Sequence, residues 1–131
     1  SLSDLGSGAG FPGLILALFN KNYDFHVKLY EKSPVKRAFL NHICDILSLK
    51  IEICANVYEG SIETDYIVTR AFKKFESIIQ VSREIAKKSH KLIVLKGQNA
   101  QEDLEKAFKN KLSIKATRDH NRHHSNPKLK N

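Results

Sequence analysis

The sequence predicts an α/β fold in which a mostly parallel sheet carries helices on both of its faces. Two observations lead to this prediction. Short segments rich in strand-forming residues alternate along the chain with segments whose apolar residues recur at helical spacing, as in folds where helices connect parallel strands. A glycine-rich turn also joins the first predicted strand to the first predicted helix, and in such sheets ligands bind outside the carboxyl ends of the strands.

The individual elements follow in order from this alternation. Strands are predicted over residues 2–5, 25–31, 50–54, 65–69 and 91–96. Helices are predicted over residues 12–20, 34–47, 75–86 and 101–111, and residues 112–117 are candidates for a last strand. The second helix begins at Ser33-Pro34, since serine caps a helix and proline suits its first turn. We expect it to bury one stripe of side chains: Val35, Ala38, Phe39, His42, Ile43, Ile46 and Leu47.

Length and composition indicate one globular domain. We expect a ligand-binding domain over residues 1–117 and a polar, basic tail over residues 118–131, for which disorder is one interpretation. The net charge of +8 favours a polyanionic partner, although part of this charge lies in the tail. We expect no membrane span and no leader peptide. Because the first strand starts almost at residue 1, we also expect a fragment, or a gene product that lacks its N-terminal part.

Cysteine and histidine do not form a recognisable catalytic or metal-binding pattern. Cys44 and Cys54 lie on a predicted helix and strand, and we expect both to be small buried residues in a reducing compartment. We expect His42 to be a core histidine, and three further histidines lie in the polar tail. We therefore predict neither a metal site nor a nucleophilic triad.

The turn from Asp4 to Gly13 carries the strongest functional signal. Gly8-x-Gly10-x-x-Gly13 fits the dinucleotide-binding pattern. Asp4-x-Gly6-x-Gly8-x-Gly10 fits the first motif of methyltransferases that use S-adenosylmethionine (SAM). A dinucleotide brings a pyrophosphate, which favours bare N–H groups and positive charge, whereas SAM carries a sulfonium and an ammonium group that a carboxylate would favour. Asp4 therefore favours SAM; a tight surface turn without a ligand is the alternative.

Three charged residues lie at the carboxyl ends of predicted strands, at the edge where a ligand should bind. Glu31 lies about 20 residues beyond the glycine turn, where an acidic side chain can accept hydrogen bonds from both hydroxyls of an unphosphorylated ribose. The adjacent Lys32 keeps a ribose phosphate open as an alternative. Arg70 follows the fourth strand and Lys96 ends the fifth, and we expect Arg70 to hold a phosphate, a guanine edge or a cofactor carboxylate. Solvated surface positions are the alternative for Glu31 and Arg70.

Four segments together carry a family resemblance. They are Asp4–Leu14 (the glycine run with Phe-Pro-Gly-Leu), Lys36–Leu40 (Lys-Arg-Ala-Phe-Leu), Thr69–Phe72 (Thr-Arg-Ala-Phe) and Leu95–Gly97 (Leu-Lys-Gly). In this combination the chain resembles the RsmG family, also called GidB, of bacterial 16S ribosomal RNA methyltransferases. The glycine run alone would not be specific for that family.

The resemblance implies a Rossmann-like SAM-dependent methyltransferase fold, incomplete at both ends in this chain. It implies methyl transfer to N7 of a guanine in 16S ribosomal RNA or the small ribosomal subunit, by a cytoplasmic monomer that needs neither metal nor membrane. By position, SAM would be bound by Asp4, Gly6, Gly8, Gly10, Phe11, Glu31, Val57, Tyr58 and Arg70. Arg70 and Lys96 would be the catalytic residues of the cleft. Guanine N7 has a free lone pair and no proton to lose, so the reaction needs alignment more than a base.

Three features depart from the family pattern. We expect its N-terminal helical segment to be missing, Asn56 and Tyr58 stand where the family usually has arginine and glutamate, and residues 118–131 are polar where closing strands are expected. Three hypotheses therefore remain. The first is a SAM-dependent rRNA guanine-N7 methyltransferase or a degenerate copy of one. The second is a non-catalytic SAM- or RNA-binding module. The third is an NAD-dependent oxidoreductase domain.

Overall fold

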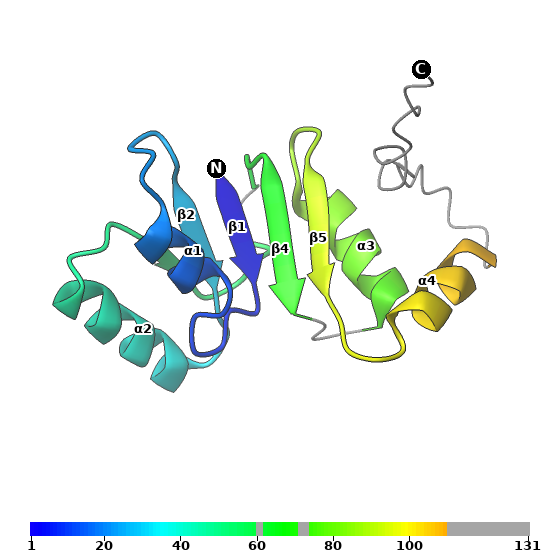
Figure 1. Ribbon diagram of the computed structural model, residues 1–131, viewed down its shortest axis with the longest axis horizontal. Helices are drawn as coiled ribbons and strands as arrows, with labels where there is room; N and C mark the ends of the chain where they lie inside the picture. The colour runs from blue at the N-terminus through cyan, green and yellow to red at the C-terminus, as the bar shows by residue number, and fades with distance from the viewer. Residues whose placement is uncertain (60–61, 71–73, 110–131) are drawn as a thin grey trace, which may run out of the picture.

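The computed structural model describes residues 1–59, 62–70 and 74–109, and within them it shows a parallel sheet flanked by helices (Figure 1). The strands are β1 (Leu2–Leu5), β2 (Val27–Tyr30), β3 (Glu52–Cys54), β4 (Tyr66–Arg70) and β5 (Lys91–Leu95). The helices are α1 (Gly13–Phe19), α2 (Pro34–Ile46), α3 (Phe75–Ile85) and α4 (Ala100–Lys109). The strand order is β3-β2-β1-β4-β5, with every pairing parallel, which confirms the expected fold class. The candidate strand at 112–117 and the expected tail lie outside the described residues.

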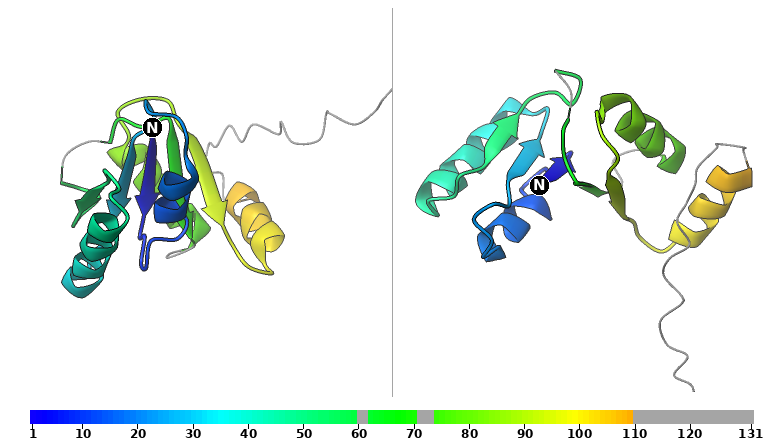
Figure 2. Two further views of the ribbon diagram at one scale, coloured as in Figure 1. Left: turned by 60° about the vertical axis from the view of Figure 1, so that its left-hand side comes forward. Right: turned by 90° about the horizontal axis from the view of Figure 1, so that it is seen from above.

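The helices occupy both faces of the sheet because the first strands are added toward one edge of the sheet and the later strands toward the other edge. From β1 the chain moves through α1 and α2 to β3 at one edge, and from β4 it moves through α3 to β5 at the other edge. Right-handed crossovers in opposite directions place their helices on opposite faces. Accordingly α1 and α2 cover one face and α3 the other, while α4 lies beside α3 at the β5 edge (Figure 2). The direction changes between β1 and β4, the place where ligands bind in such sheets.

Two apolar clusters fill the spaces between the sheet and its helices. Leu29 and Val68 of the sheet pack with Leu40 of α2 on one face. Leu5 and Ile67 pack with the inner side of α3 on the other face. Neighbouring strand residues point to opposite faces, so both faces of the central strands are apolar, as expected of a sheet with helices on both sides.

Local sequence signals locate several element boundaries. The span of β1 agrees with its prediction, and Ser33 caps α2 because its hydroxyl oxygen accepts a hydrogen bond from the Lys36 N–H at 3.4 Å. The outer strand β3 has three residues instead of the expected five. Among the described strands it is hydrogen-bonded to β2 alone, so its ends lack the support of a second described neighbour.

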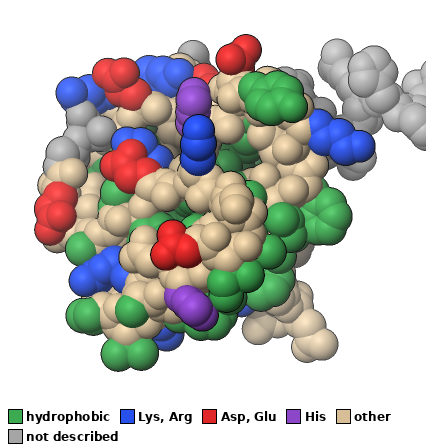
Figure 3. All heavy atoms as spheres, turned by 90° about the vertical axis from the view of Figure 1, so that its left-hand side faces the viewer, with side chains coloured by type: hydrophobic (Ala, Val, Ile, Leu, Met, Phe, Trp, Pro, Cys, Tyr) green, Lys and Arg blue, Asp and Glu red, His purple; other side chains and the backbone are tan. Residues whose placement is uncertain are grey.

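The predicted buried stripe of α2 is mostly wrong. Leu40 and Cys44, which lie outside the stripe, are buried in the core, and from the stripe Ile43 packs partly buried against it. Val35 is 80% exposed and Ile46 61% exposed. His42 is exposed as well, so it is not a core histidine. Apolar side chains occupy two sides of this helix, and the sheet covers only one of them. Periodicity does not tell which side faces the sheet, and the prediction took the wrong one. Figure 3 shows hydrophobic side chains reaching the surface among charged ones on this side of the molecule.

The apolar run of α1 is buried only in part. Gly13 and Leu14 are buried against the sheet, but Phe19 is 77% exposed. The helix is seven residues long and presents one side to β1 and β2, so the rest of its apolar surface faces outward. Of the two cysteines, Cys44 is buried as expected and Cys54 is half-buried.

Candidate functional site

The glycine turn between β1 and α1 requires glycine for its backbone. Gly6, Gly8 and Gly10 have φ angles of 75°, 59° and 98°, a region that residues with a Cβ rarely adopt. The turn is anchored to the end of β2, because the N–H groups of Gly6 and Ser7 both donate to the Tyr30 carbonyl, at 2.8 and 3.0 Å. The chain therefore reverses tightly at the carboxyl end of the central strand and leaves backbone surface open to a ligand.

The glycines of this turn have different surroundings. Gly6 and Gly8 line a cavity, whereas Gly10 is packed against α1 and α2. A Cβ on Gly10 would lie 2.7 Å from the Cβ of Leu14 and 3.1 Å from a methyl of Leu40. Gly10 thus allows the turn to approach the helices closely. The sequence pattern predicts that all three glycines contact the ligand, whereas in the structure Gly10 lies outside the cavity.

Asp4 lies beneath the turn rather than in the cavity. Its side chain is fully buried, and Oδ2 accepts a hydrogen bond from the Gly13 N–H at 2.9 Å. Burial raises the pKa of this carboxyl to about 6, although the Gly13 and Ser7 hydrogen bonds and the Arg70 charge act in the opposite direction. Oδ1 has no hydrogen-bond partner within the described part of the chain. The expected direct contact with a cationic ligand is therefore not supported here, since Asp4 instead fixes the start of α1 to the end of β1.

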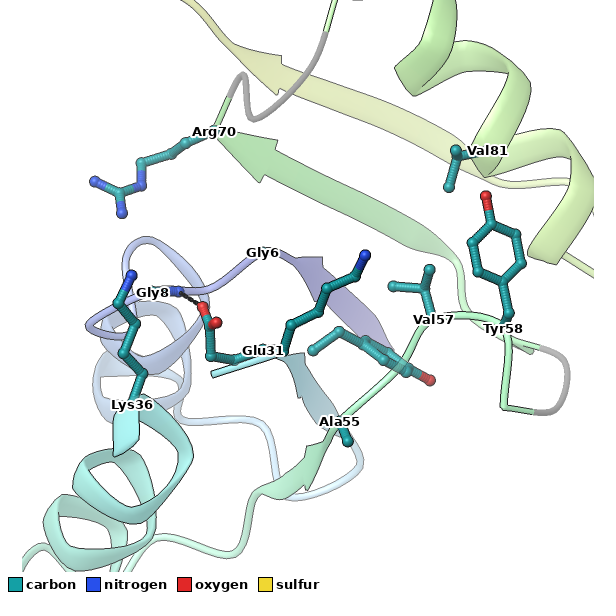
Figure 4. Close-up of a pocket in the computed structure, with 11 residues that line it drawn as sticks. Gly6, Gly8, Glu31, Lys36, Ala55, Val57, Tyr58, Arg70 and Val81 are labelled. Atoms are coloured by element: carbon teal, nitrogen blue, oxygen red, sulfur yellow. Dashed lines mark hydrogen bonds between the residues drawn. The ribbon is translucent and has the colours of Figure 1, made fainter. Parts of the chain in front are cut away.

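A cavity of about 490 Å³ opens at the carboxyl edge of the sheet, beside the turn. Its lining comes from the glycine turn, the β2–α2 loop, the segment after β3, the end of β4 and α3: Gly6, Gly8, Tyr30, Glu31, Lys32, Lys36, Ala55, Val57, Tyr58, Arg70 and Val81. In Figure 4, Arg70 and Lys36 lie with the carboxylate of Glu31 at one end, while Val57, Tyr58 and Val81 form the other. The cavity therefore has a polar, charged end and a largely apolar end.

Glu31 connects the turn with the next helix. It is 9% exposed; its Oε2 accepts from the Gly8 N–H and its Oε1 from the Ser33 N–H, both at 2.8 Å. Each carboxylate oxygen can accept a second hydrogen bond, so the group keeps capacity for hydroxyl donors from a ligand. The sequence placed Glu31 at the end of β2, and the structure brings it into contact with the turn.

Val57 and Tyr58 stand where the sequence placed them, in the wall of the cavity after β3. An Asx-type turn holds this segment, because the Asn56 side-chain oxygen accepts from the Tyr58 N–H at 3.1 Å. The Tyr58 ring is 53% exposed, so it borders the opening rather than the floor. Ala55 and Val81 add apolar surface nearby, and this end of the cavity suits a flat, largely apolar group.

Arg70 reaches over the turn from the end of β4. A Cβ on Gly8 would lie 3.1 Å from its Nη2 atom, so the guanidinium lies directly against the turn (Figure 4). The side chain is exposed, and within the described residues its guanidinium makes no hydrogen bond or ion pair. A permanently charged donor group at the rim of the cavity can bind an incoming carboxylate, phosphate or guanine edge.

Lys96 and Phe11 do not join this cavity. Lys96 forms an ion pair with Asp103 of α4 and borders a separate hollow of about 380 Å³ with Gly97 and Asn99. Phe11 is 51% exposed and does not line the cavity, as is also true of Gly10 and Asp4. The structure therefore assembles six of the ten expected site residues: Gly6, Gly8, Glu31, Val57, Tyr58 and Arg70.

Several lining residues were not among the expected site residues. Tyr30 and Lys32 flank Glu31 in the sequence, so their proximity to the site was implied by their neighbour. Lys36 lies in the Lys-Arg-Ala-Phe-Leu segment, in the first turn of α2, and the capping signal at Ser33 could have located it. No local signal marks Val81, because its position depends on how α3 packs against the sheet.

The comparisons with known proteins agree with this geometry. A family model described as rRNA small subunit methyltransferase G (GidB) matches residues 1–129. The chain belongs to this family. Among the family's curated members, ribosomal RNA small subunit methyltransferase G 1 of Bdellovibrio bacteriovorus is 35% identical over 109 residues, covering 83% of this chain and 52% of that protein. The corresponding protein of Pelagibacter ubique is 34% identical over 113 residues, covering 83% of this chain and 53% of that protein.

The chain spans about half the length of these curated relatives. Solved structures show the same fold at lower identity. Coclaurine N-methyltransferase bound to N-methylheliamine and SAH has a TM-score of 0.58 at 21% identity, covering 71% of this chain and 29% of that chain. TehB from Haemophilus influenzae has a TM-score of 0.57 at 20% identity, and the match covers 82% of this chain and 44% of that chain. The fold is thus the Rossmann-like fold of methyltransferases.

Two further features bear on the class of site. Nowhere in residues 1–59, 62–70 and 74–109 do three His, Cys, Asp or Glu side chains gather in a way that could hold a metal ion. No described helix combines the length and the apolar character that crossing a bilayer requires.

Proposed function

We propose that this chain binds SAM in the cavity at the glycine turn and transfers its methyl group to N7 of a guanine in small-subunit ribosomal RNA. The observation that carries the proposal is the hydrogen bond between Gly8 and Glu31. It joins two motif positions that are 23 residues apart into one cofactor-sized site at the edge where this fold binds ligands. Membership in the rRNA small subunit methyltransferase G family supports the choice of SAM over NAD and of ribosomal RNA as substrate.

The residues present fit SAM in size and chemistry. Glu31 would accept hydrogen bonds from the ribose hydroxyls with its remaining lone pairs. Val57 and Tyr58 would flank the adenine at the apolar end. The turn at Gly6 and Gly8 would contact the methionine portion, because glycine leaves its backbone accessible. SAM itself supplies an electrophilic methyl group on a sulfonium centre.

The chain's contribution to the reaction is alignment. Guanine N7 presents a lone pair and no proton, so methyl transfer requires no general base. The described part of the cavity accordingly needs only to orient the two reactants. Arg70 would hold the guanine or an adjacent phosphate over the turn, where its charge also attracts RNA. Lys96, which is paired with Asp103, would contact RNA outside the cavity rather than the reacting atoms.

Assignments for the whole protein follow from the same proposal. Its partner would be 16S ribosomal RNA or the small ribosomal subunit, and it would act as a monomer in the cytoplasm. The net charge of +8 supports a polyanionic partner. The non-catalytic SAM- or RNA-binding module is the second candidate, because the chain spans about half the length of its curated relatives and leaves apolar side chains of α1 and α2 exposed.

The test is a methyl-transfer assay with labelled SAM and unmethylated small-subunit RNA, together with calorimetric titration of SAM and NAD. Labelling of guanine N7 and binding of SAM support the enzyme. Binding of SAM without transfer supports the non-catalytic module. Preferential binding of NAD would contradict both.

A further inference from the structure

Arg37, near the start of α2, holds the loop that carries Glu31. Its Nη1 donates hydrogen bonds to two successive backbone carbonyls, that of Glu31 at 2.9 Å and that of Lys32 at 2.6 Å. One Nη group carries two hydrogens, so it can serve both carbonyls at once. We propose that Arg37 is a positioning residue that fixes Glu31 in the orientation in which its carboxylate reaches both Gly8 and the ribose of the cofactor. The inference rests on the proposed function in taking Glu31 as the ribose ligand.

The bonds around Glu31 explain why the carbonyl contact affects the carboxylate. The Glu31 N–H donates to the Cys54 carbonyl at 2.9 Å, so β3 holds the residue from its N-terminal side. After Glu31 the chain leaves the sheet. The hydrogen bonds from Arg37 hold the carbonyls of Glu31 and Lys32 toward α2. The carboxylate then turns back to accept from Gly8 and from Ser33. Without Arg37, the peptide groups on the C-terminal side of Glu31 would be free to move. The orientation of the Glu31 side chain would then no longer be fixed.

The guanidinium group suits this task better than a lysine ammonium. Arg37 must reach back five and six residues from the first turn of a helix, and its planar donor groups are oriented in advance. A lysine at this position keeps the charge and can donate to one carbonyl, so Arg37→Lys should restore part of the effect. Arg37 is half-buried and does not line the cavity, so it acts on a ligand through Glu31.

The first experiment measures amide hydrogen exchange in the cofactor-free chain. Arg37→Ala should raise the exchange rates of the Gly8 and Ser33 amides, the two that bond to the Glu31 carboxylate, by about tenfold, the size of one charge-assisted hydrogen bond. Cys44→Ala is the matched control, because it removes a buried side chain of the same helix away from the cavity. Equal rates at Gly8 and Ser33 in both variants would overturn the proposal.

The second experiment is a double-mutant cycle of affinity for S-adenosylhomocysteine, measured by calorimetry. Arg37→Ala should weaken binding by about tenfold in the native background and have little further effect in Glu31→Gln. Arg37→Lys should recover part of the loss. An equal loss in both backgrounds would overturn the positioning role. If the unaltered chain binds no S-adenosylhomocysteine while the Gly8 amide still responds to Arg37→Ala, the proposed function fails and the positioning of Glu31 stands.

Discussion

Gly8 and Gly10 lie two residues apart in the same turn, yet alanine should have different consequences at each. At Gly10, with φ of 98°, a Cβ would lie 2.7 and 2.8 Å from the Cβ and Cδ2 of Leu14 and 3.1 Å from Leu40. Left-handed backbone costs a residue with a Cβ about 1–2 kcal/mol. Overpacking a core contact costs about 1–3 kcal/mol more. Gly10→Ala should therefore lower the free energy of unfolding by about 2–5 kcal/mol.

At Gly8 the same substitution meets a different environment. The φ of 59° again costs about 1–2 kcal/mol. The nearest atom to the new Cβ would be Nη2 of Arg70, at 3.1 Å, at the end of a flexible side chain that can move aside. The stability loss should stay near the backbone cost alone. The methyl group would, however, enter the cavity on the side of Arg70, so the Kd for SAM should rise at least about tenfold.

Urea unfolding and calorimetric titration with SAM distinguish these effects when both variants are measured side by side. We expect Gly10→Ala to be the less stable protein, and Gly8→Ala to be the one that loses affinity while keeping most of its stability. If Gly8→Ala bound SAM as the unaltered chain does, the cavity would not be the cofactor site. If the two variants lost equal stability, the distinction between a packing glycine and a ligand-facing glycine would be wrong.

Three further predictions concern single side chains. Burial raises the pKa of Asp4 to about 6, so the stability that its protonated carboxyl contributes is complete below pH 4 and is lost as pH rises through about 6. Urea unfolding should show a loss of about 3 kcal/mol in the free energy of unfolding over this range. If Asp4→Asn had the same pH profile as the unaltered chain, this prediction would be contradicted. Leu40→Ala should cost about 2–5 kcal/mol and Val35→Ala less than about 0.5 kcal/mol, whereas equal losses in thermal unfolding would restore the stripe predicted from the sequence. Arg70→Ala should weaken RNA binding and reduce the slope of log K against log salt by about 1; unchanged RNA binding and methylation would refute its role.

The sequence predicts the fold well because the signals that determine it are local. The glycine run, the Ser33-Pro34 helix start and the alternation of strands and helices each depend on neighbouring residues. Glu31 could be assigned to the site because strand ends in a parallel sheet converge at one edge. The helix connections then fix the strand order within narrow limits.

The sequence does not predict which side chains face the core or the cavity, because this depends on how the helices and strands pack against each other. Two sides of α2 are apolar, and only the packing angle decides that Leu40 rather than Phe39 reaches the core. The motif could not show that Asp4 points toward Gly13 beneath the turn instead of into the cavity. Lys96 was grouped with Arg70 because both follow neighbouring strands, but Asp103 on α4 pairs with it outside the cavity.

The most direct test of the account is calorimetric titration of the chain with SAM beside the Glu31→Gln variant. The account predicts one bound SAM per chain and a Kd at least about tenfold higher in the variant, because charge-assisted hydrogen bonds to the ribose are lost. Thermal unfolding of both proteins shows whether the variant is folded at the temperature of the titration. The absence of SAM binding by the unaltered chain, or equal affinity in the two folded proteins, would contradict a cofactor site at the glycine turn.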